Sequence, residues 1–171
     1  MGLFGPPDVA RARASGKIES MLKAARYKRD PAVAEAGRAA LTVHLDLLIR
    51  ELKSRNIRRM QIARQALVAI GPVARDRLVF ILGEGHVHRR QDVAFVLGEM
   101  KDEAAVGPLC ESLRHTDPLL RLLSVQALGK IGSPEALHKV RLACMDADPA
   151  VAKEARKAYG KISAGMHAAG G

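Results

Sequence analysis

His86 and His88, in the stretch "HVH", are the strongest metal-ligand candidates in the sequence. Two histidines separated by one residue can chelate a metal ion in a loop or strand, but on a helix they point in different directions. A site would also need a third ligand, and only Glu84 and Asp92 are near. We therefore expect that His86 caps a helix and that His88 is solvated, and we predict no metal and no other cofactor.

Cys110 and Cys144 are the other residues suited to chemistry, and they do not form a C-x-x-C pair. Free cysteine is among the most frequently buried residue types, so we expect both to belong to the core. The sequence contains no P-loop, no H-E-x-x-H zinc motif and no G-x-S-x-G nucleophile motif. These observations predict that the protein is not an enzyme.

A stretch of sequence that recurs five times, here called the phrase, predicts the helices that must position any functional side chain. We number each copy of the phrase from its first residue, which we call its register mark. The marks are Asp30, Asn56, His86, Asp117 and Asp148, and the spacings between successive marks are 26, 30, 31 and 31 residues. Asp and Asn are favoured helix caps, and Pro is tolerated at the first helical position. The phrases are "DPAVAEAGRAALTVH", "NIRRMQIARQALVAI", "HVHRRQDVAFVLGEM", "DPLLRLLSVQALGKI" and "DPAVAKEARKAYGKI".

Each phrase combines small and large apolar residues in a way that suits a helix packed closely on its neighbours. The tenth position after the mark is Ala or Val, and the next position is Leu or Tyr. The twelfth position is glycine in the last three phrases, at Gly98, Gly129 and Gly160.

A second apolar run follows each of the first four phrases, at residues 45–52, 73–82, 104–113 and 136–145. Pro108 lies inside its run and should kink or restart that helix. Helix pairs repeated every 20–50 residues are typical of solenoids, in which each unit buries its apolar face against the next. Together with 3% aromatic residues, the pattern predicts an all-α fold, an α-solenoid (α/α superhelix).

We expect one structural domain with three parts. Residues 1–29 would form an N-terminal capping helix pair, and residues 163–171 a flexible tail. The repeats would occupy residues 30–162, with units starting near 30, 56, 86, 117 and 148. The absence of an apolar run of 18 residues predicts a cytoplasmic protein with no membrane partner.

The pattern of residues 117–137, with Asp-Pro, Ala-Leu, Gly and then Pro-Glu-Ala-Leu, resembles a HEAT repeat of the short bacterial type found in lyase-like HEAT proteins. The opening "MGLFGPPDV" and the later "YKRDPAV" also resemble small prokaryotic HEAT-repeat proteins. Such repeats carry arginine four positions after the capping Asp, where this chain has Arg90 and Arg121. The resemblance implies about five helix-pair HEAT-like repeats, and we find no acid–base pair that would carry over the enzymatic activity of some HEAT-like families.

Positive charge is concentrated in the middle of the chain. Of the formal net charge of +10, residues 50–90 contribute +7, with ten Lys or Arg against three Asp or Glu. Nine of the ten are Arg, which favours bidentate contact with carboxylate or phosphate. The stretch could be a solvated face, a surface for an acidic protein or a surface for nucleic acid, although the few aromatic residues offer little base stacking.

The function predicted from these features is a non-catalytic scaffold or adaptor. It would bind a protein partner with an acidic surface through the concave face of the solenoid. The alternative is sequence-independent binding of nucleic acid through residues 50–90. Candidate contact residues are Asp46, Arg50, Lys53, Arg55, Arg58, Arg59, Arg75, Arg77, Arg89, Arg90, Glu111, Arg114, His138 and Arg141.

Overall fold

The structure is a computed structural model that describes residues 6–169, and the regular secondary structure of these residues is entirely helical, with no strand among them. The all-α prediction is therefore confirmed. The α-helices are α1 (Val9–Ala14), α2 (Ile18–Ala25), α3 (Pro31–Thr42), α4 (Leu45–Glu51), α5 (Ile57–Ile70), α6 (Pro72–Glu84), α7 (Val87–Met100), α8 (Val106–Ser112), α9 (Pro118–Ile131), α10 (Leu137–Ala143) and α11 (Pro149–Ala169).

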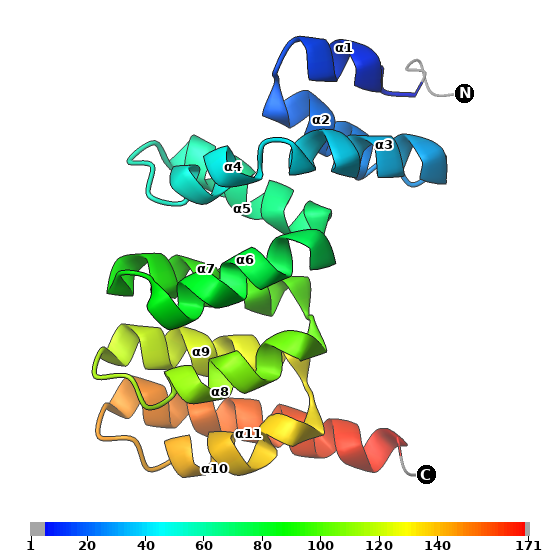
Figure 1. Cartoon of the computed structure of the whole chain (residues 1–171). Coiled ribbons are helices and arrows are strands. Elements are labelled where there is room, and N and C mark those ends of the chain that lie inside the picture. Colours follow the sequence, from blue (N-terminus) through cyan, green and yellow to red (C-terminus); the bar gives the residue numbers. More distant parts are fainter. Residues whose placement is uncertain (1–5, 170–171) are drawn as a thin grey trace. The chain divides into compact units, whose positions relative to one another are not determined.

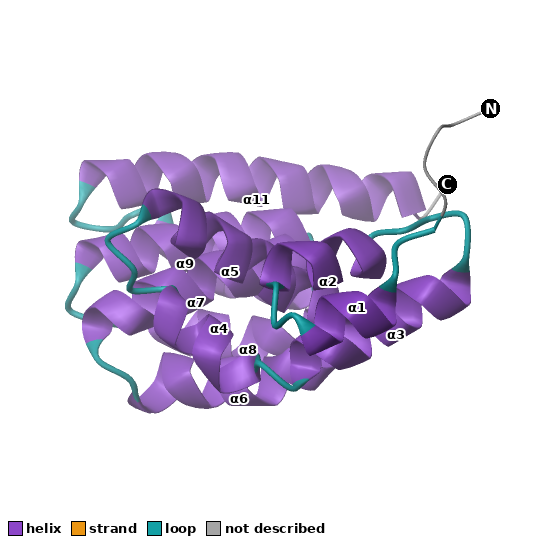
Figure 2. Cartoon of the chain, turned by 90° about the horizontal axis from the view of Figure 1, so that it is seen from above, coloured by secondary structure: helices purple, strands orange, loops and turns teal. Residues whose placement is uncertain are grey.

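The chain divides into two compact units, Met1–Ala74 and Arg75–Gly171, with the boundary in the first turn of α6. In the first unit α2 packs against α1, α3 and α5, and α5 also contacts α4. In the second unit α7 lies along α9 and α9 lies along α11, while α8 contacts α9 and α10 contacts α11 (Figures 1 and 2). Helix α11 continues to Ala169, so it extends into the segment that the sequence suggested as a flexible tail.

The first helix of each repeat begins one residue after its register mark, and in four of the five repeats the marked side chain caps it. The Asp30 carboxylate accepts a hydrogen bond from the Ala32 backbone N–H at 2.9 Å. The equivalent caps are Asn56 for α5, Asp117 for α9 and Asp148 for α11. His86 occupies the same position before α7, but its side chain makes no capping hydrogen bond, so this expected cap was wrong.

The second helices show how the chain accommodates its prolines. Two of them start with a single 3-10 turn, η1 (Glu103–Ala105) before α8 and η2 (Pro134–Ala136) before α10. Pro108 is the third residue of α8, in the first turn, where a backbone N–H would have no intrahelical partner. The proline therefore falls where α8 restarts after η1, as the sequence predicted.

The large apolar residue at the eleventh position after the mark forms the centre of each unit's core. Leu41 and Leu67 in the first unit, and Leu97 and Leu128 in the second, have side chains with no solvent exposure. Burial of one leucine side chain contributes roughly 1.5–3 kcal/mol. The repeat in the sequence is therefore a repeat in core packing.

Glycine allows consecutive first helices to touch backbone to backbone in the second unit. A Cβ atom placed on Gly98 of α7 would lie 2.6 Å from Cα of Ala127 on α9. A Cβ atom on Gly129 of α9 would lie 2.9 Å from Cβ of Ala158 on α11. The twelfth residue of one repeat thus meets the tenth residue of the next, which explains the small residues at both positions.

An arginine near the start of α9 connects two loops of the second unit. Arg121 makes a bidentate pair with Asp146, with Nη2–Oδ1 and Nε–Oδ2 distances of 2.7 and 2.8 Å. Its remaining nitrogen donates to the carbonyl oxygens of His115 and Thr116. These hydrogen bonds from the Arg121 side chain hold the pKa of Asp146 below its ordinary value.

The Gly98→Ala variant should lower the free energy of unfolding, by about 1–3 kcal/mol, because the new methyl group overlaps the backbone of α9. The Gly160→Ala variant is the matched control, since a Cβ atom at Gly160 meets nothing within 4 Å. It should raise stability by up to about 1 kcal/mol through helix propensity. Urea unfolding followed by circular dichroism measures both, and effects of equal sign would contradict the close contact.

The Asp146→Asn variant should lower the free energy of unfolding at pH 7 by about 1.5–3 kcal/mol, the range for hydrogen bonds to charged groups. The pKa of Asp146 is lowered by folding, so its contribution is complete above the unfolded value near 4 and is lost as the pH falls through the folded pKa. Urea unfolding at pH 7 and pH 3 should show the difference from wild type shrinking at low pH. Asp76→Asn, at a side chain that is 85% exposed, is the control with little effect at either pH.

Candidate functional site

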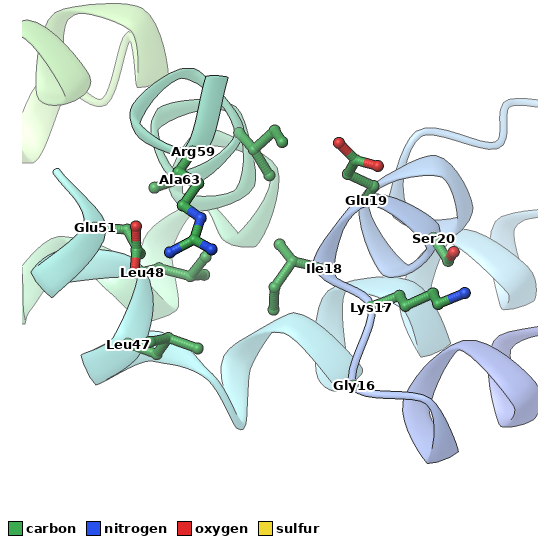
Figure 3. A pocket seen from close by; sticks show the side chains of 11 residues that line it. Gly16, Lys17, Ile18, Glu19, Ser20, Leu47, Leu48, Glu51, Arg59 and Ala63 are labelled. Carbon is green, nitrogen blue, oxygen red and sulfur yellow. The ribbon is translucent and has the colours of Figure 1, made fainter. Parts of the chain in front are cut away.

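A pocket opens in the first unit between α2, α4 and α5, and we call it the α2–α4–α5 pocket. Its volume is about 560 Å³, within the range of small-molecule sites. One wall comes from the start of α2 and the other from α4 and the first turns of α5 (Figure 3). The lining residues are Gly16, Lys17, Ile18, Glu19, Ser20, Leu47, Leu48, Glu51, Arg59, Ile62 and Ala63.

The most informative side chain of the pocket is Glu51. Its Oε2 atom is buried and has no hydrogen-bond partner. Leaving a buried acceptor without a partner costs roughly 1–3 kcal/mol, and more for a charged group. Glu51 is also the last residue of α4, where the helix dipole disfavours a negative charge. Its position therefore opposes stability on two grounds, which is typical of residues kept for function.

The first turn of α5 carries two basic side chains. Arg58 and Arg59 occupy the first turn, where the helix dipole disfavours a positive charge. Arg58 connects α5 to α2, since its Nη2 lies 2.9 Å from Oε1 of Glu19. The Arg59 guanidinium lies on the same side of the pocket as Glu51 and Leu48, whereas Lys17 and Ser20 point away from the cavity (Figure 3).

The pocket combines apolar walls with charges at its edge. Ile18 faces the cavity from α2, and Leu47 and Leu48 face it from α4 (Figure 3). A buried acceptor beside such walls suits a ligand that has an aliphatic part and a hydrogen-bond donor, above all an ammonium group. Apolar walls and a buried carboxylate oxygen therefore meet in one cavity, which is also lined by Lys17 and Arg59.

Six of the candidate contact residues from the sequence lie in the first unit. Asp46 and Arg50 are exposed on α4, and Lys53 and Arg55 are exposed in the loop that leads to α5. Of the six, only Arg59 lines the pocket. Sequence reasoning missed Glu51, although a signal existed: the residue lies three positions after Leu48 and four after Leu47, on the same side of its helix.

The other eight candidate residues lie in the second unit, and several have structural roles. Arg75 pairs with Asp76 and Asp102, at 3.1 and 3.2 Å, and these carboxylates raise its pKa. Arg90 donates to the carbonyl oxygens of Gly85 and Gly83. The Arg77 guanidinium lies 5.9 Å from the centre of the Phe80 ring, and Arg89 is half-buried on α7. The remaining candidates are exposed: Glu111, Arg114, His138 and Arg141.

The division into two units also divides the basic stretch of residues 50–90. Its positions up to Arg64 belong to the first unit and those from Arg75 onward to the second. Counted over whole units, residues 1–74 hold 14 Lys or Arg against 6 Asp or Glu, and residues 75–171 hold 14 against 12. The first unit therefore carries +8 of the net +10, which makes it the basic part of the molecule.

The residues first considered for chemistry are not brought together. Among residues 6–169 no three His, Cys, Asp or Glu side chains form a group that could hold a metal ion. Cys110 is buried, and its burial raises the pKa of the thiol. Cys144 is half-buried, and its thiol lies 3.4 Å from the carbonyl oxygen of Val140. None of the helices described is both long enough and apolar enough to cross a bilayer.

Comparison with known proteins identifies the repeats and offers named relatives. The family described as HEAT repeats matches residues 76–160. Deoxyhypusine hydroxylase of Gallus gallus is 36% identical over 73 residues, which are 42% of this chain and 24% of that protein. Deoxyhypusine hydroxylase-B of Oryza sativa subsp. japonica is 29% identical over 94 residues, 54% of this chain and 31% of that protein. The chain thus matches between a quarter and a third of these relatives' length.

Solved structures show the same fold at low sequence identity. Human deoxyhypusine hydroxylase in complex with glycerol aligns with a TM-score of 0.56 and 19% identity, over 91% of this chain and 76% of that one. A designed armadillo repeat protein in complex with the peptide (KR)4 aligns with a TM-score of 0.50 and 14% identity, over 92% and 87% of the two chains. The predicted α-solenoid of about five helix pairs is confirmed by these neighbours and by the helix order.

The predicted function was wrong. A non-catalytic scaffold, with nucleic-acid binding as the alternative and no enzymatic role, is contradicted because the curated relatives and a structural neighbour carry the name of an enzyme. The prediction rested on the absence of short catalytic motifs from the sequence. In a helical-repeat protein a site is assembled from residues on separate helices, so no local motif need exist.

The resemblance stated from the sequence is confirmed at the level of the repeat. The named relatives above are eukaryotic deoxyhypusine hydroxylases, so the prokaryotic and lyase-like parts of that resemblance stay predictions. Residues 76–160 of this chain thus match the family of HEAT repeats, within a chain whose described part has the α-solenoid fold.

Proposed function

We propose that this chain is the substrate-recognising, HEAT-repeat part of an enzyme that modifies an aminoalkyl-lysine side chain of a protein. The substrate class comes from the relatives, which are named for deoxyhypusine. Deoxyhypusine is a lysine whose side-chain nitrogen carries an aminobutyl group. It is therefore a long aliphatic chain that ends in an ammonium group.

The buried, unpartnered Oε2 atom of Glu51 is the observation that carries the proposal. An ammonium group has three donors and no acceptor, so it complements a carboxylate that lacks a partner. Charge-assisted hydrogen bonds of this kind are about twice as strong as neutral ones. The bound cation would also relieve the cost of a carboxylate at the C-terminus of α4.

The apolar walls of the α2–α4–α5 pocket support the same substrate class. Ile18, Leu47 and Leu48 offer methyl groups against which the methylene groups of an aminobutyl chain can pack. Each buried methylene group contributes about 0.8 kcal/mol. Selection of the extended side chain over unmodified lysine then follows from the extra methylene groups and the second amine. A cytoplasmic location and a protein partner with an acidic surface remain predictions.

The Glu51→Gln variant should bind a deoxyhypusine-containing peptide at least tenfold more weakly than the wild type, because one hydrogen bond to a charged group is worth about 1.5–3 kcal/mol. Fluorescence anisotropy with a labelled peptide measures the dissociation constant. The same peptide with unmodified lysine should bind more weakly to the wild type. Glu35→Gln, at a side chain that is 71% exposed on α3, is the control with unchanged affinity. Equal binding of the two peptides would refute the proposal.

The Glu51→Met variant should raise the free energy of unfolding of the ligand-free chain by about 1 kcal/mol, while its peptide binding is lost. Methionine removes the unpartnered oxygen and the unfavourable charge at the end of α4 but keeps a side chain of similar length. Thermal unfolding with and without the peptide separates the two effects. A loss of stability would instead assign Glu51 a structural role and contradict its place in substrate binding.

A further inference from the structure

Gly160 is the third of a series of glycines at the twelfth position of the phrase. In the two preceding copies this glycine lets the next first helix come close to the backbone. Gly98 meets Ala127 in this way, and Gly129 meets Ala158. Gly160, in contrast, is exposed, and a Cβ atom placed on it would have no atom from another described part of the chain within 4 Å. The third glycine therefore has the position of a close contact without the contact.

Helix geometry places Gly160 on the side of α11 that faces away from α9. Successive helical residues are turned by about 100°, so positions two apart lie on nearly opposite sides. Ala158 of α11 touches α9, and Gly160 follows it by two positions. On α9 the same relation holds, because Ala127 touches α7 and Gly129 touches α11. Gly160 therefore lies where one more helix would continue the series α7, α9, α11 (Figure 1).

Nothing within the described chain explains a glycine at this position. Glycine in a helix interior is less favourable than alanine, because it gives up more conformational freedom on folding. Gly160 lies in the middle of α11, a helix of 21 residues, so it does not act as a helix cap. A residue that weakens its own helix and permits no contact within the chain is explained by a contact with another molecule.

The surface around Gly160 is basic. Lys153, Arg156 and Lys157 are exposed and precede Gly160 by seven, four and three positions, so they lie on its side of α11. We call these three residues and Gly160 the Gly160 face. Helix α11 has one carboxylate, that of Glu154, which lies 3.4 Å from Nζ of Lys157. Arg156 donates to a backbone carbonyl oxygen, which leaves its charge uncancelled.

We propose that the Gly160 face binds an α-helix of another protein, which places Ala or Gly against Gly160 and Asp or Glu near the three cations. The proposal goes beyond the function proposed above and does not depend on it. The bound helix would repeat the contact that α11 makes with α9, and its acidic side chains would complement the positive charge of the face. A nucleic acid would contact the cations without needing a glycine, and a second copy of this chain would bring the same positive charge.

The test measures the binding of two synthetic peptides to the full chain by fluorescence anisotropy. Both peptides are held helical by a covalent staple and carry Glu on the side that faces the protein. They differ at one contact position, which is Ala in one peptide and Leu in the other. The Ala peptide should bind roughly tenfold more tightly, because leucine keeps the two backbones apart. Equal affinity of the two peptides, or no binding of the Ala peptide, would overturn the proposal.

The Gly160→Leu variant should bind the Ala peptide at least tenfold more weakly than the wild type and should still fold, since the space around Gly160 is open. Gly165→Leu is the matched control on the same helix, turned by about 140° from Gly160 and equally open. It should keep the affinity of the wild type, and circular dichroism checks the helix content of both variants. Equal effects of the two substitutions would contradict a contact at Gly160.

Two further measurements test the chemistry of the partner. The Lys153→Glu variant should weaken binding of the Ala peptide severalfold at low salt and less at high salt, because salt screens the attraction. Unchanged affinity at low salt would refute the acidic character of the partner. Sedimentation of the chain alone should show a monomer, and a dimer that Gly160→Leu abolishes would assign the face to a second copy and overturn the proposal.

Discussion

The contact between a glycine on one first helix and an alanine on the next is the constraint on which the second unit depends. Gly98 against Ala127, and Gly129 against Ala158, leave no room for another carbon atom. The spacing of α7, α9 and α11 is set by these contacts, because protein interiors are close-packed and cannot absorb an extra methyl group without strain. The burial of the leucines and the loop contacts of the unit depend on that spacing between the helices.

Arginines complete the repeat where the helices end. Arg121 joins Asp146 to the carbonyl groups of the loop before α9, and Arg90 holds the loop before α7. Both occur four residues after a register mark, so they belong to the repeat and not to a binding surface. Part of the arginine content of the middle of the chain is therefore structural. The first unit carries most of the net charge, +8 of +10.

In the second unit the arginines stabilise loops, whereas in the first unit several charges lie where the helix dipole disfavours them. Glu51 stands at the negative end of α4, and Arg58 and Arg59 stand at the positive end of α5. Charges in these positions cost stability wherever they have no partner. The placement of Glu51 and Arg59 at a pocket with apolar walls is the physical argument for the proposed ligand-binding role, and the proposed substrate class comes from the names of the relatives.

The sequence by itself determined the helical repeat, its caps and its core positions, because capping and apolar periodicity are local properties that neighbouring residues express directly. The sequence could also have indicated Glu51 as a functional candidate, because it is an acidic residue on an apolar helix face. Only the tertiary structure decided that Glu51 meets Ile18 and Arg59 at one pocket, since these residues come from three helices. It also decided which arginines are bound to loops and which are exposed, because the partners of a long side chain depend on contacts between segments far apart in the chain.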